Sequence, residues 1–174
     1  MAMLIPDIKV ELIPGLSAAG FSLGEDFFSI QEKIGAVGWY ESNACLNDVL
    51  IKSAEWIGIK SKVGTAVGLE KVVESFIYRN DLISLDFGKT KKLYRIVVGK
   101  GYLGRFKSVR PGDDLLLISS LYELDFNDVD DDFLIIESGD YIEGISFITD
   151  YRSSLEHAPD QKIECISIHD WSFR

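Results

Sequence analysis

The chain has 174 residues, of which 47% are hydrophobic, and its formal net charge is -10 at pH 7. This length and hydrophobic content predict a folded domain with a substantial core, and they exclude a disordered chain. The negative charge disfavours direct contact with nucleic acid or anionic lipid and favours contact with cationic surfaces.

The N-terminal sequence and the cysteine content indicate the cellular compartment. The opening MAMLIPDIKVELIPG lacks the basic region and the long apolar run of a signal peptide. No stretch of the chain approaches the ~18 to 20 apolar residues of a membrane span. The two cysteines, Cys45 and Cys165, are too few for a disulfide framework. We therefore expect a cytoplasmic protein that has no membrane partner.

The first third of the chain predicts one strand and one helix. Over residues 8–12, apolar residues alternate with charged ones, which is the period of a half-buried strand. Residues 24–38, GEDFFSIQEKIGAVG, open with two acids and end in glycine. Phe27, Ile30 and Ile34 have helical spacing within this stretch. We expect an amphipathic helix of about three turns there.

The rest of the chain predicts mainly antiparallel strands. Short apolar segments alternate with turns that contain glycine or other turn-forming residues. The expected strands are 72–78, 82–87, 93–98, 102–106, 141–149 and 162–168.

A second helix is expected at residues 110–125, RPGDDLLLISSLYELD. Asp113 and Asp114 lie near its start, where acids favour a helix N-terminus. Its apolar stripe consists of Leu115, Ile118, Leu121 and Tyr122. The predicted fold class is α+β, a mostly antiparallel β-sheet with two amphipathic helices packed on it.

The stretches that lead into the two helices are similar. AAGFSLGEDFFSI and YLGRFKSVRPGDDLLLI both run from glycine through a short apolar segment and a turn to two acids and a helix. This similarity predicts a single domain, residues 1–174, with two similar half-units, 1–100 and 101–174. The alternative is that any α+β protein offers such strand-to-helix turns.

Charge is distributed unevenly along the chain. Residues 1–88 carry a net charge of -5, residues 89–110 carry +8, and residues 111–174 carry -13. The basic segment can neutralise part of the acidic one if their strands are neighbours. Even complete pairing leaves an acidic excess, so we expect an uncompensated acidic surface in the last third of the chain.

The stretch FNDVDDDFLIIESGDYIEGISF, which begins at Phe126, concentrates this charge and predicts a partner-binding surface. Clustered carboxylates attract a basic protein over a long range, and a few aromatic side chains anchor it. The candidate contact residues are Asp125, Asp128, Asp130, Asp131, Asp132, Glu137, Asp140 and Glu143, with Tyr122, Phe126 and Tyr141 as anchors. The alternative is a solvated acidic loop, and Trp171 is a further candidate anchor.

Motifs for catalysis or metal binding are incomplete in this sequence. The alternate spacing from Asp128 to Asp132 resembles an EF-hand, but Phe133 and Gly139 stand where glycine and glutamate are required. His169 is followed by Asp170, yet adjacent strand residues point to opposite faces and no nucleophile motif accompanies them. We expect His169 on an edge strand or in the tail, and we expect no enzymatic activity, cofactor or metal.

The stretch IPGLSAAGFSLGEDFFSIQEKIG resembles the opening of bacterial immunity proteins, including those that neutralise contact-dependent growth inhibition toxins. The similarity covers about 20 residues and is carried by Pro14, Gly15, Gly20, Leu23, Gly24 and Glu25. The resemblance implies a cytoplasmic antitoxin that binds a cognate basic toxin, such as a nuclease, through its acidic surface.

Two other functions remain open from the sequence. Residues 89–110 combine eight basic residues with Tyr94, Tyr102 and Phe106, a composition that suits a single-stranded nucleic-acid-binding module. A structural or oligomerising subunit would instead expose strand edges or an apolar patch.

Overall fold

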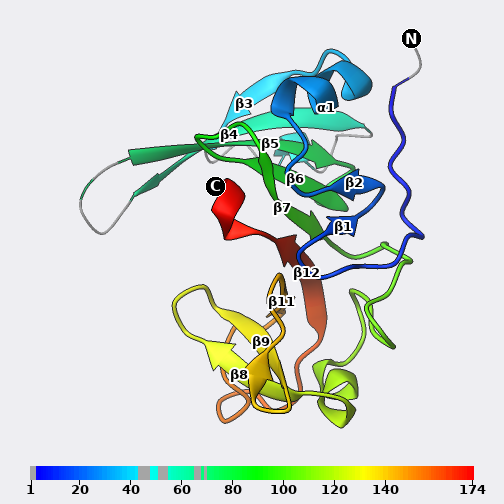
Figure 1. The fold of residues 1–174 in the computed structure, drawn as a ribbon, viewed down its shortest axis with the longest axis vertical. Coiled ribbons are helices and arrows are strands. Elements are labelled where there is room, and N and C mark those ends of the chain that lie inside the picture. Colours follow the sequence, from blue (N-terminus) through cyan, green and yellow to red (C-terminus); the bar gives the residue numbers. More distant parts are fainter. Residues whose placement is uncertain (1–2, 43–47, 51–54, 65–67, 69) are drawn as a thin grey trace.

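The fold is built around one large twisted sheet (Figure 1). A computed structural model describes residues 3–42, 48–50, 55–64, 68 and 70–174. The elements of the first half are β1 (Ser17–Ala18), β2 (Phe21–Ser22), α1 (Phe27–Ile34), β3 (Trp39–Glu41), β4 (Trp56–Gly64), β5 (Glu70–Tyr78), β6 (Ile83–Phe87) and β7 (Leu93–Val98). Those of the second half are η1 (Leu115–Ser120), β8 (Glu123–Asn127), β9 (Asp132–Glu137), β10 (Asp140–Tyr141), β11 (Ile145–Thr149), β12 (Ile163–His169) and η2 (Trp171–Phe173).

The strands follow a simple order within the described part of the chain. Ten of them form one sheet in the order β10-β9-β11-β12-β7-β6-β5-β4-β3, with β8 paired to β9, while β1 and β2 form a separate small hairpin. Neighbouring strands are antiparallel except for β3 and β4. The predicted α+β class with a mostly antiparallel sheet is confirmed.

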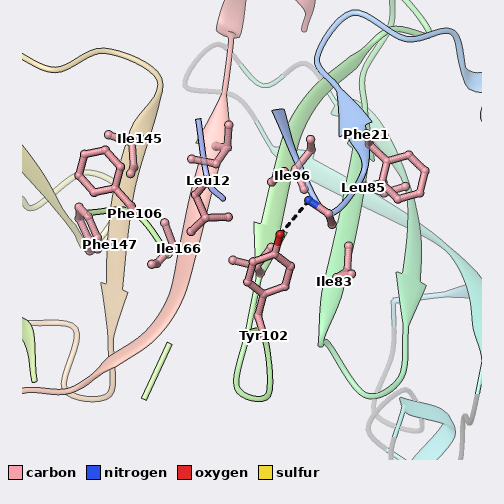
Figure 2. Close-up of a cluster of buried hydrophobic side chains, with 14 of the residues drawn as sticks. Leu12, Phe21, Ile83, Leu85, Ile96, Tyr102, Phe106, Ile145, Phe147 and Ile166 are labelled. Atoms are coloured by element: carbon pink, nitrogen blue, oxygen red, sulfur yellow. Dashed lines mark hydrogen bonds between the residues drawn. The ribbon is translucent and has the colours of Figure 1, made fainter. Parts of the chain in front are cut away.

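One face of the sheet carries a continuous hydrophobic core that draws on both halves of the chain (Figure 2). Alternate residues of the central strands, such as Leu85, Ile96 and Ile166, are fully buried there. The N-terminal segment crosses this face, and the Tyr102 hydroxyl accepts a hydrogen bond from the Ala19 backbone N–H at 3.0 Å (Figure 2). The opposite face carries a smaller buried cluster, formed by Leu50, Ile57, Ile59 and Ile77, and the polar groups described below.

Four of the expected strands are confirmed with small changes at their ends. Residues 72–78, 82–87, 93–98 and 162–168 lie in β5, β6, β7 and β12. The expected strand 141–149 is divided, because a turn at Glu143 and Gly144 separates β10 from β11. Gly144 has a φ of 81°, a left-handed conformation that glycine adopts without strain.

The expected strands 8–12 and 102–106 are wrong. The two segments lie beside one another, but they contact through irregular hydrogen bonds in place of a ladder: both Leu103 N and Gly104 N donate to the Ile8 carbonyl. A Cβ at Gly104 would lie 1.8 Å from the carbonyl oxygen of Val10. The alternation over 8–12 still follows burial, since Leu12 lies in the core. Burial alternates here without strand pairing.

The first expected helix is present as α1, with about two turns in place of three. The Asp26 side chain caps it by accepting hydrogen bonds from the backbone N–H groups of Phe28 and Ser29. The predicted stripe of Phe27, Ile30 and Ile34 is buried against the sheet.

The second expected helix is the short 3-10 helix η1, not an amphipathic α-helix. Asp114 caps it, and Leu115 and Ile118, three residues apart, share the buried side as a 3-10 helix requires. Leu121, assigned to the apolar stripe, is 53% exposed. The hydroxyls of Ser119 and Ser120 donate to backbone carbonyls three residues back. Such side-chain hydrogen bonds compete with those of a regular helix, so they do not favour extension of η1.

Both halves contain the same junction between a turn glycine and a strand. Gly24 N donates to the Leu93 carbonyl, and Gly112 N donates to the Ile163 carbonyl, each at 2.7 Å. The two glycines have similar positive φ values, 86° and 98°. In each case the capping aspartate and the helix follow directly.

The strands after these junctions also correspond. In the β6–β7 hairpin the register shifts at Asp86/Phe87, and in the β11–β12 hairpin it shifts at the corresponding Ile148/Thr149. Asp86 faces Arg95 across the first hairpin, and Ile148 faces Cys165 at the corresponding place in the second. Just beyond each hairpin, Gly99 N donates to the Leu82 carbonyl and His169 N donates to the Gly144 carbonyl.

Two further expectations concern the cysteines and membranes. Cys45 lies outside the described residues, whereas Cys165 is a half-buried free thiol whose pKa burial raises to about 11. In the portion of the chain with described coordinates, no helix combines the length and apolar character needed to cross a membrane.

Candidate partner-binding surface

Most of the predicted contact residues lie on the hairpin of β8 and β9, which we call the acidic hairpin (yellow in Figure 1). Asn127 organises its four-residue turn, residues 128–131. The Asn127 Nδ2 donates to Asp130 Oδ2 at 3.1 Å and to Asp132 Oδ1 at 3.0 Å, and Oδ1 accepts from Val129 N. The turn therefore displays its carboxylates from an ordered backbone, with Val129 84% exposed at the tip.

The carboxylates of this surface are not neutralised by ion pairs. Across the residues that the structure describes, none of the eight predicted acids lies within 4.0 Å of a lysine, arginine or histidine nitrogen. Six of them belong to exposed residues, and Asp125 and Asp132 are half-buried. A dense, unpaired negative surface attracts cations and basic proteins.

The bases of residues 89–110 instead pair mainly with acids of the first half. Lys91 contacts Glu74, Lys92 lies 3.8 Å from Asp26, and Arg95 lies 2.6 Å from Asp86. Among the described residues, one base of this segment pairs with an acid of the last third, Arg105 with Asp113 at 3.4 Å. The sequence prediction of an uncompensated acidic surface thus agrees with the ion pairs observed.

The three predicted anchors differ in their availability. Tyr122 is buried and its ring stacks on Phe106 at 5.9 Å, so it is a core residue and its assignment as an anchor is wrong. Phe126 is half-buried and packs against Phe133 at 5.0 Å. Tyr141 is 52% exposed, as an anchor requires.

Tyr141 is fixed in place by the acidic hairpin. Its hydroxyl donates to Asp125 Oδ2 at 2.5 Å, over β9, which lies between β10 and β8. This hydrogen bond, together with the charge of the carboxylate, raises the pKa of Tyr141 above its ordinary value. The ring is therefore held in one orientation beside the acids.

A cleft of about 660 Å³, which we call the C-terminal cleft, opens next to this hairpin. Its lining includes Tyr141 and Glu143 on one side and His169, Asp170 and Trp171 on the other. Trp171 is 47% exposed and stacks on the His169 ring at 4.6 Å. The candidate anchor Trp171 thus lies in the same cleft as Tyr141, which could not be inferred from residues 30 positions apart in the sequence.

His169 lies in the centre of the sheet, so its expected place on an edge strand or in the tail is wrong. β12 runs between β11 and β7, and His169 is opposite Arg95. Burial lowers the pKa of its imidazole below the ordinary value. Asp170 is half-buried, and hydrogen bonds from Ser172 lower the pKa of its carboxyl.

A second polar site lies on the same face of the sheet as His169, which is opposite Arg95. It is not among the sites predicted from the sequence. The buried Asp86 carboxylate accepts hydrogen bonds from Ser75 at 2.7 Å, from Ser84 at 3.0 Å and from Arg95 Nε at 2.6 Å. Asp86 raises the pKa of the Arg95 guanidinium. Arg95 and Asp130 both line a cleft of about 310 Å³ beside this network. The available signal was Ser84 and Asp86 at alternate positions of residues 82–87, together with Arg95 within the apolar segment 93–98.

The aromatic residues of the basic segment are not available to stack on nucleic-acid bases. Its three interleaved aromatic residues, Tyr94, Tyr102 and Phe106, are at most 5% exposed and cannot stack on bases. Lys91 and Lys92 are engaged in ion pairs near one end of β7, and Lys100 follows its other end. The geometry does not favour the nucleic-acid alternative.

The aspartates of the turn also do not converge as metal ligands. Nowhere in the described ranges do three or more His, Cys, Asp or Glu side chains form a group suited to a metal ion. Asp130 and Asp132 are instead both hydrogen-bonded to the Asn127 amide.

Comparison of the chain with protein-family models, with curated proteins and with solved structures finds no match. The fold and the site therefore define the chain only as an α+β protein with an acidic, partly aromatic surface beside a cleft.

Proposed function

We propose that this protein is a cytoplasmic immunity protein, an antitoxin that binds and neutralises a basic protein toxin, such as a nuclease, by means of the acidic hairpin. The observation that carries the proposal is the set of unpaired carboxylates on this hairpin, while Lys91, Lys92 and Arg95 pair with acids of the first half of the chain. The protein acts by binding and has no catalytic role.

Charge and exposed apolar groups have separate parts in this function. Nucleases are basic because their substrates are polyanions, and a compact field of carboxylates accelerates their association. Exposed Val129, Tyr141 and Trp171 supply apolar contact area next to that field. Interfaces are held mainly by a few such anchors, and aromatic residues are prominent among them.

A growth-rescue experiment tests the proposal. We expect the reading frame immediately upstream to encode a toxin. The C-terminal domain of that toxin is expressed from an inducible promoter, with and without this chain, and the growth rate is measured. We expect growth arrest without the chain and normal growth with it, together with a stable complex of the two purified proteins. Arrest that persists with the folded chain present, or absence of a complex, contradicts the proposal.

We also propose that the chain consists of two related half-units, 1–100 and 101–174. The support is the repeated glycine-to-strand junction and the register shift at corresponding positions of the two central hairpins. In this description only the second half-unit carries the acidic hairpin, so the toxin-binding surface is a specialisation of one half.

A further inference from the structure

The C-terminal cleft combines features that suit one kind of ligand group. Its described lining contains two carboxylates, Glu143 and Asp170, and no lysine or arginine. Hydrogen bonds from Ser172 lower the pKa of Asp170 below its ordinary value, which itself lies well below neutral pH, so this group is ionised at neutral pH. Glu143 is exposed and pairs with no base among the described side chains. The cleft therefore favours a cation.

Tyr141 supplies an aromatic face to the same cleft. Among the described aromatic rings none stacks on Tyr141, and its hydroxyl donates to the Asp125 carboxylate. Donation to an anion makes the ring more electron-rich, and such a ring attracts a cation over its face. A similar contact exists inside the molecule, since the Arg174 guanidinium lies 5.6 Å from the Trp171 ring centre on the neighbouring cleft.

His169 provides a buried polar group that the protein leaves without a second partner. The residue is 8% exposed, and its Nδ1 lies 3.2 Å from the Ser167 hydroxyl. Nε2 bonds no described residue, and because no buried side-chain nitrogen or oxygen of the described part lacks a partner, Nε2 is reached from the solvent. In the tautomer whose Nδ1 carries the proton, Nε2 is an acceptor, and His169 is one of the residues that line the cleft.

The first half of the chain indicates that the hairpin does not need this histidine. Gly99 occupies the corresponding position and makes the corresponding backbone hydrogen bond, to Leu82 where His169 bonds Gly144. A buried imidazole costs desolvation free energy that glycine avoids. Its presence in the second half only is therefore consistent with a role in the cleft.

We infer that the C-terminal cleft receives an arginine side chain of the partner, with the guanidinium over the Tyr141 ring and its N–H groups bonded to Glu143 and Asp170. A planar guanidinium with five donors satisfies an aromatic face and two carboxylates at once, which a lysine ammonium does less well. The inference rests on the proposed function for the nature of the partner, a basic protein.

The test needs no toxin. Nα-acetyl-arginine amide is titrated into the full chain, and the NMR signals of the Tyr141 amide and the Trp171 indole N–H are followed. The buried Trp56 indole, which bonds the Leu4 carbonyl, is an internal reference. Nα-acetyl-citrulline amide, equal in shape but neutral, is the matched ligand. We expect saturable shifts with the arginine compound and an affinity about five-fold or more weaker with citrulline.

Two pairs of variants locate the effect. Glu143→Gln with Asp170→Asn should weaken arginine binding about five-fold or more, and Asn still caps η2. Glu156→Gln with Asp160→Asn removes the same charge from exposed residues outside the cleft lining and should change affinity less than about two-fold. Tyr141→Leu should weaken binding, whereas Tyr151→Leu, at an exposed tyrosine elsewhere, should not.

Equal affinity for the arginine and citrulline compounds overturns the inference, as do shifts that do not saturate. Equal losses in the two charge variants overturn it as well, because they indicate a diffuse field and not a cleft. The titration uses only this chain, so its result is independent of the growth rescue. Failed rescue with successful arginine binding contradicts the proposed toxin-neutralising function but not arginine binding in the C-terminal cleft. Rescue without arginine binding contradicts arginine binding in the cleft but not the proposed function.

Discussion

His169 lies on a central strand of the sheet, where burial of most of the residue reduces the solvation of an imidazolium. Desolvation is the largest influence on its pKa and lowers it from the ordinary value of 6.5. Arg95 opposes protonation further, while Asp130, Asp132 and Asp170 favour it more weakly than burial disfavours it. The folded protein therefore prefers the neutral ring.

This preference makes the stability of the protein depend on pH. When the pH falls below about 6.5, histidine in the unfolded chain binds a proton more readily than His169 in the folded protein. The free energy of unfolding should therefore decrease between pH 7.5 and pH 5.5. Replacing His169 with Gln should remove this part of the decrease, measured by urea unfolding at both pH values.

His157, exposed in a loop, is the matched control for this experiment. The His157→Gln variant should retain the decrease seen in the parent protein. An unchanged decrease in His169→Gln would show that other groups cause the acid sensitivity.

At the scale of elements, the acidic hairpin owes its shape to one turn. Asp131 has a φ of 54°, a conformation that Asp and Asn tolerate better than most residues, and Asn127 holds Asp130 and Asp132 through its side-chain amide. Asparagine at all three aspartate positions keeps these features and removes three charges. The hairpin can thus be neutralised without being unfolded.

The triple variant Asp130→Asn, Asp131→Asn and Asp132→Asn should slow association with the toxin about ten-fold at low salt and flatten its salt dependence. Stopped-flow mixing with the toxin domain at several salt concentrations measures both. The triple Glu11→Gln, Glu32→Gln and Glu41→Gln removes the same charge from exposed sites on the first half and should have a much smaller effect. Similar effects of the two triples would assign steering to net charge alone.

The elements that local pattern predicts well are those with regular pairing. Residues 93–98 match β7 at both ends, because an apolar run between glycine turns in a hairpin leaves few other arrangements. Residues 8–12 alternate in burial but pair irregularly, since Gly104 lets two chain segments approach too closely for a ladder. The position of such an approach depends on tertiary contacts that alternation does not encode.

The candidate site also has one part that the sequence predicts and one part that it does not. The carboxylates of the acidic hairpin follow from composition, and the lack of partners for them follows from the charge excess. The C-terminal cleft does not, because it forms only when β12 returns through the centre of the sheet and brings Trp171 beside Tyr141. Tyr122 was misassigned because its place in the apolar pattern fitted both a helix face and an exposed anchor.

At the scale of the whole molecule, the two half-units that we propose meet at the pairing of β7 with β12, where Ser167 lies opposite Val97. The β6–β7 hairpin lies on one side of this pairing and the β11–β12 hairpin on the other, and the two hairpins differ at one corresponding residue pair. The first half-unit has the charged pair Asp86 and Arg95, and the second has Ile148 and Cys165. Both pairs sit next to the same register shift, so the hairpin geometry accepts either.

A buried ion pair contributes little net stability, because desolvation offsets the attraction, but removing one partner leaves the other uncompensated. The Asp86 side chain is 4% exposed, so Arg95→Cys alone should lower the free energy of unfolding by about 3 kcal/mol. The double variant Asp86→Ile with Arg95→Cys copies the second half-unit and should remain within about 1 kcal/mol of the parent in urea unfolding under reducing conditions. A double variant as unstable as the single one would mean that the half-units are not interchangeable at this pair. Recovery of stability would instead mean that folding does not require the charged pair. The presence of Arg95 would then be explained by its place in the lining of the cleft beside Asp86 and not by folding.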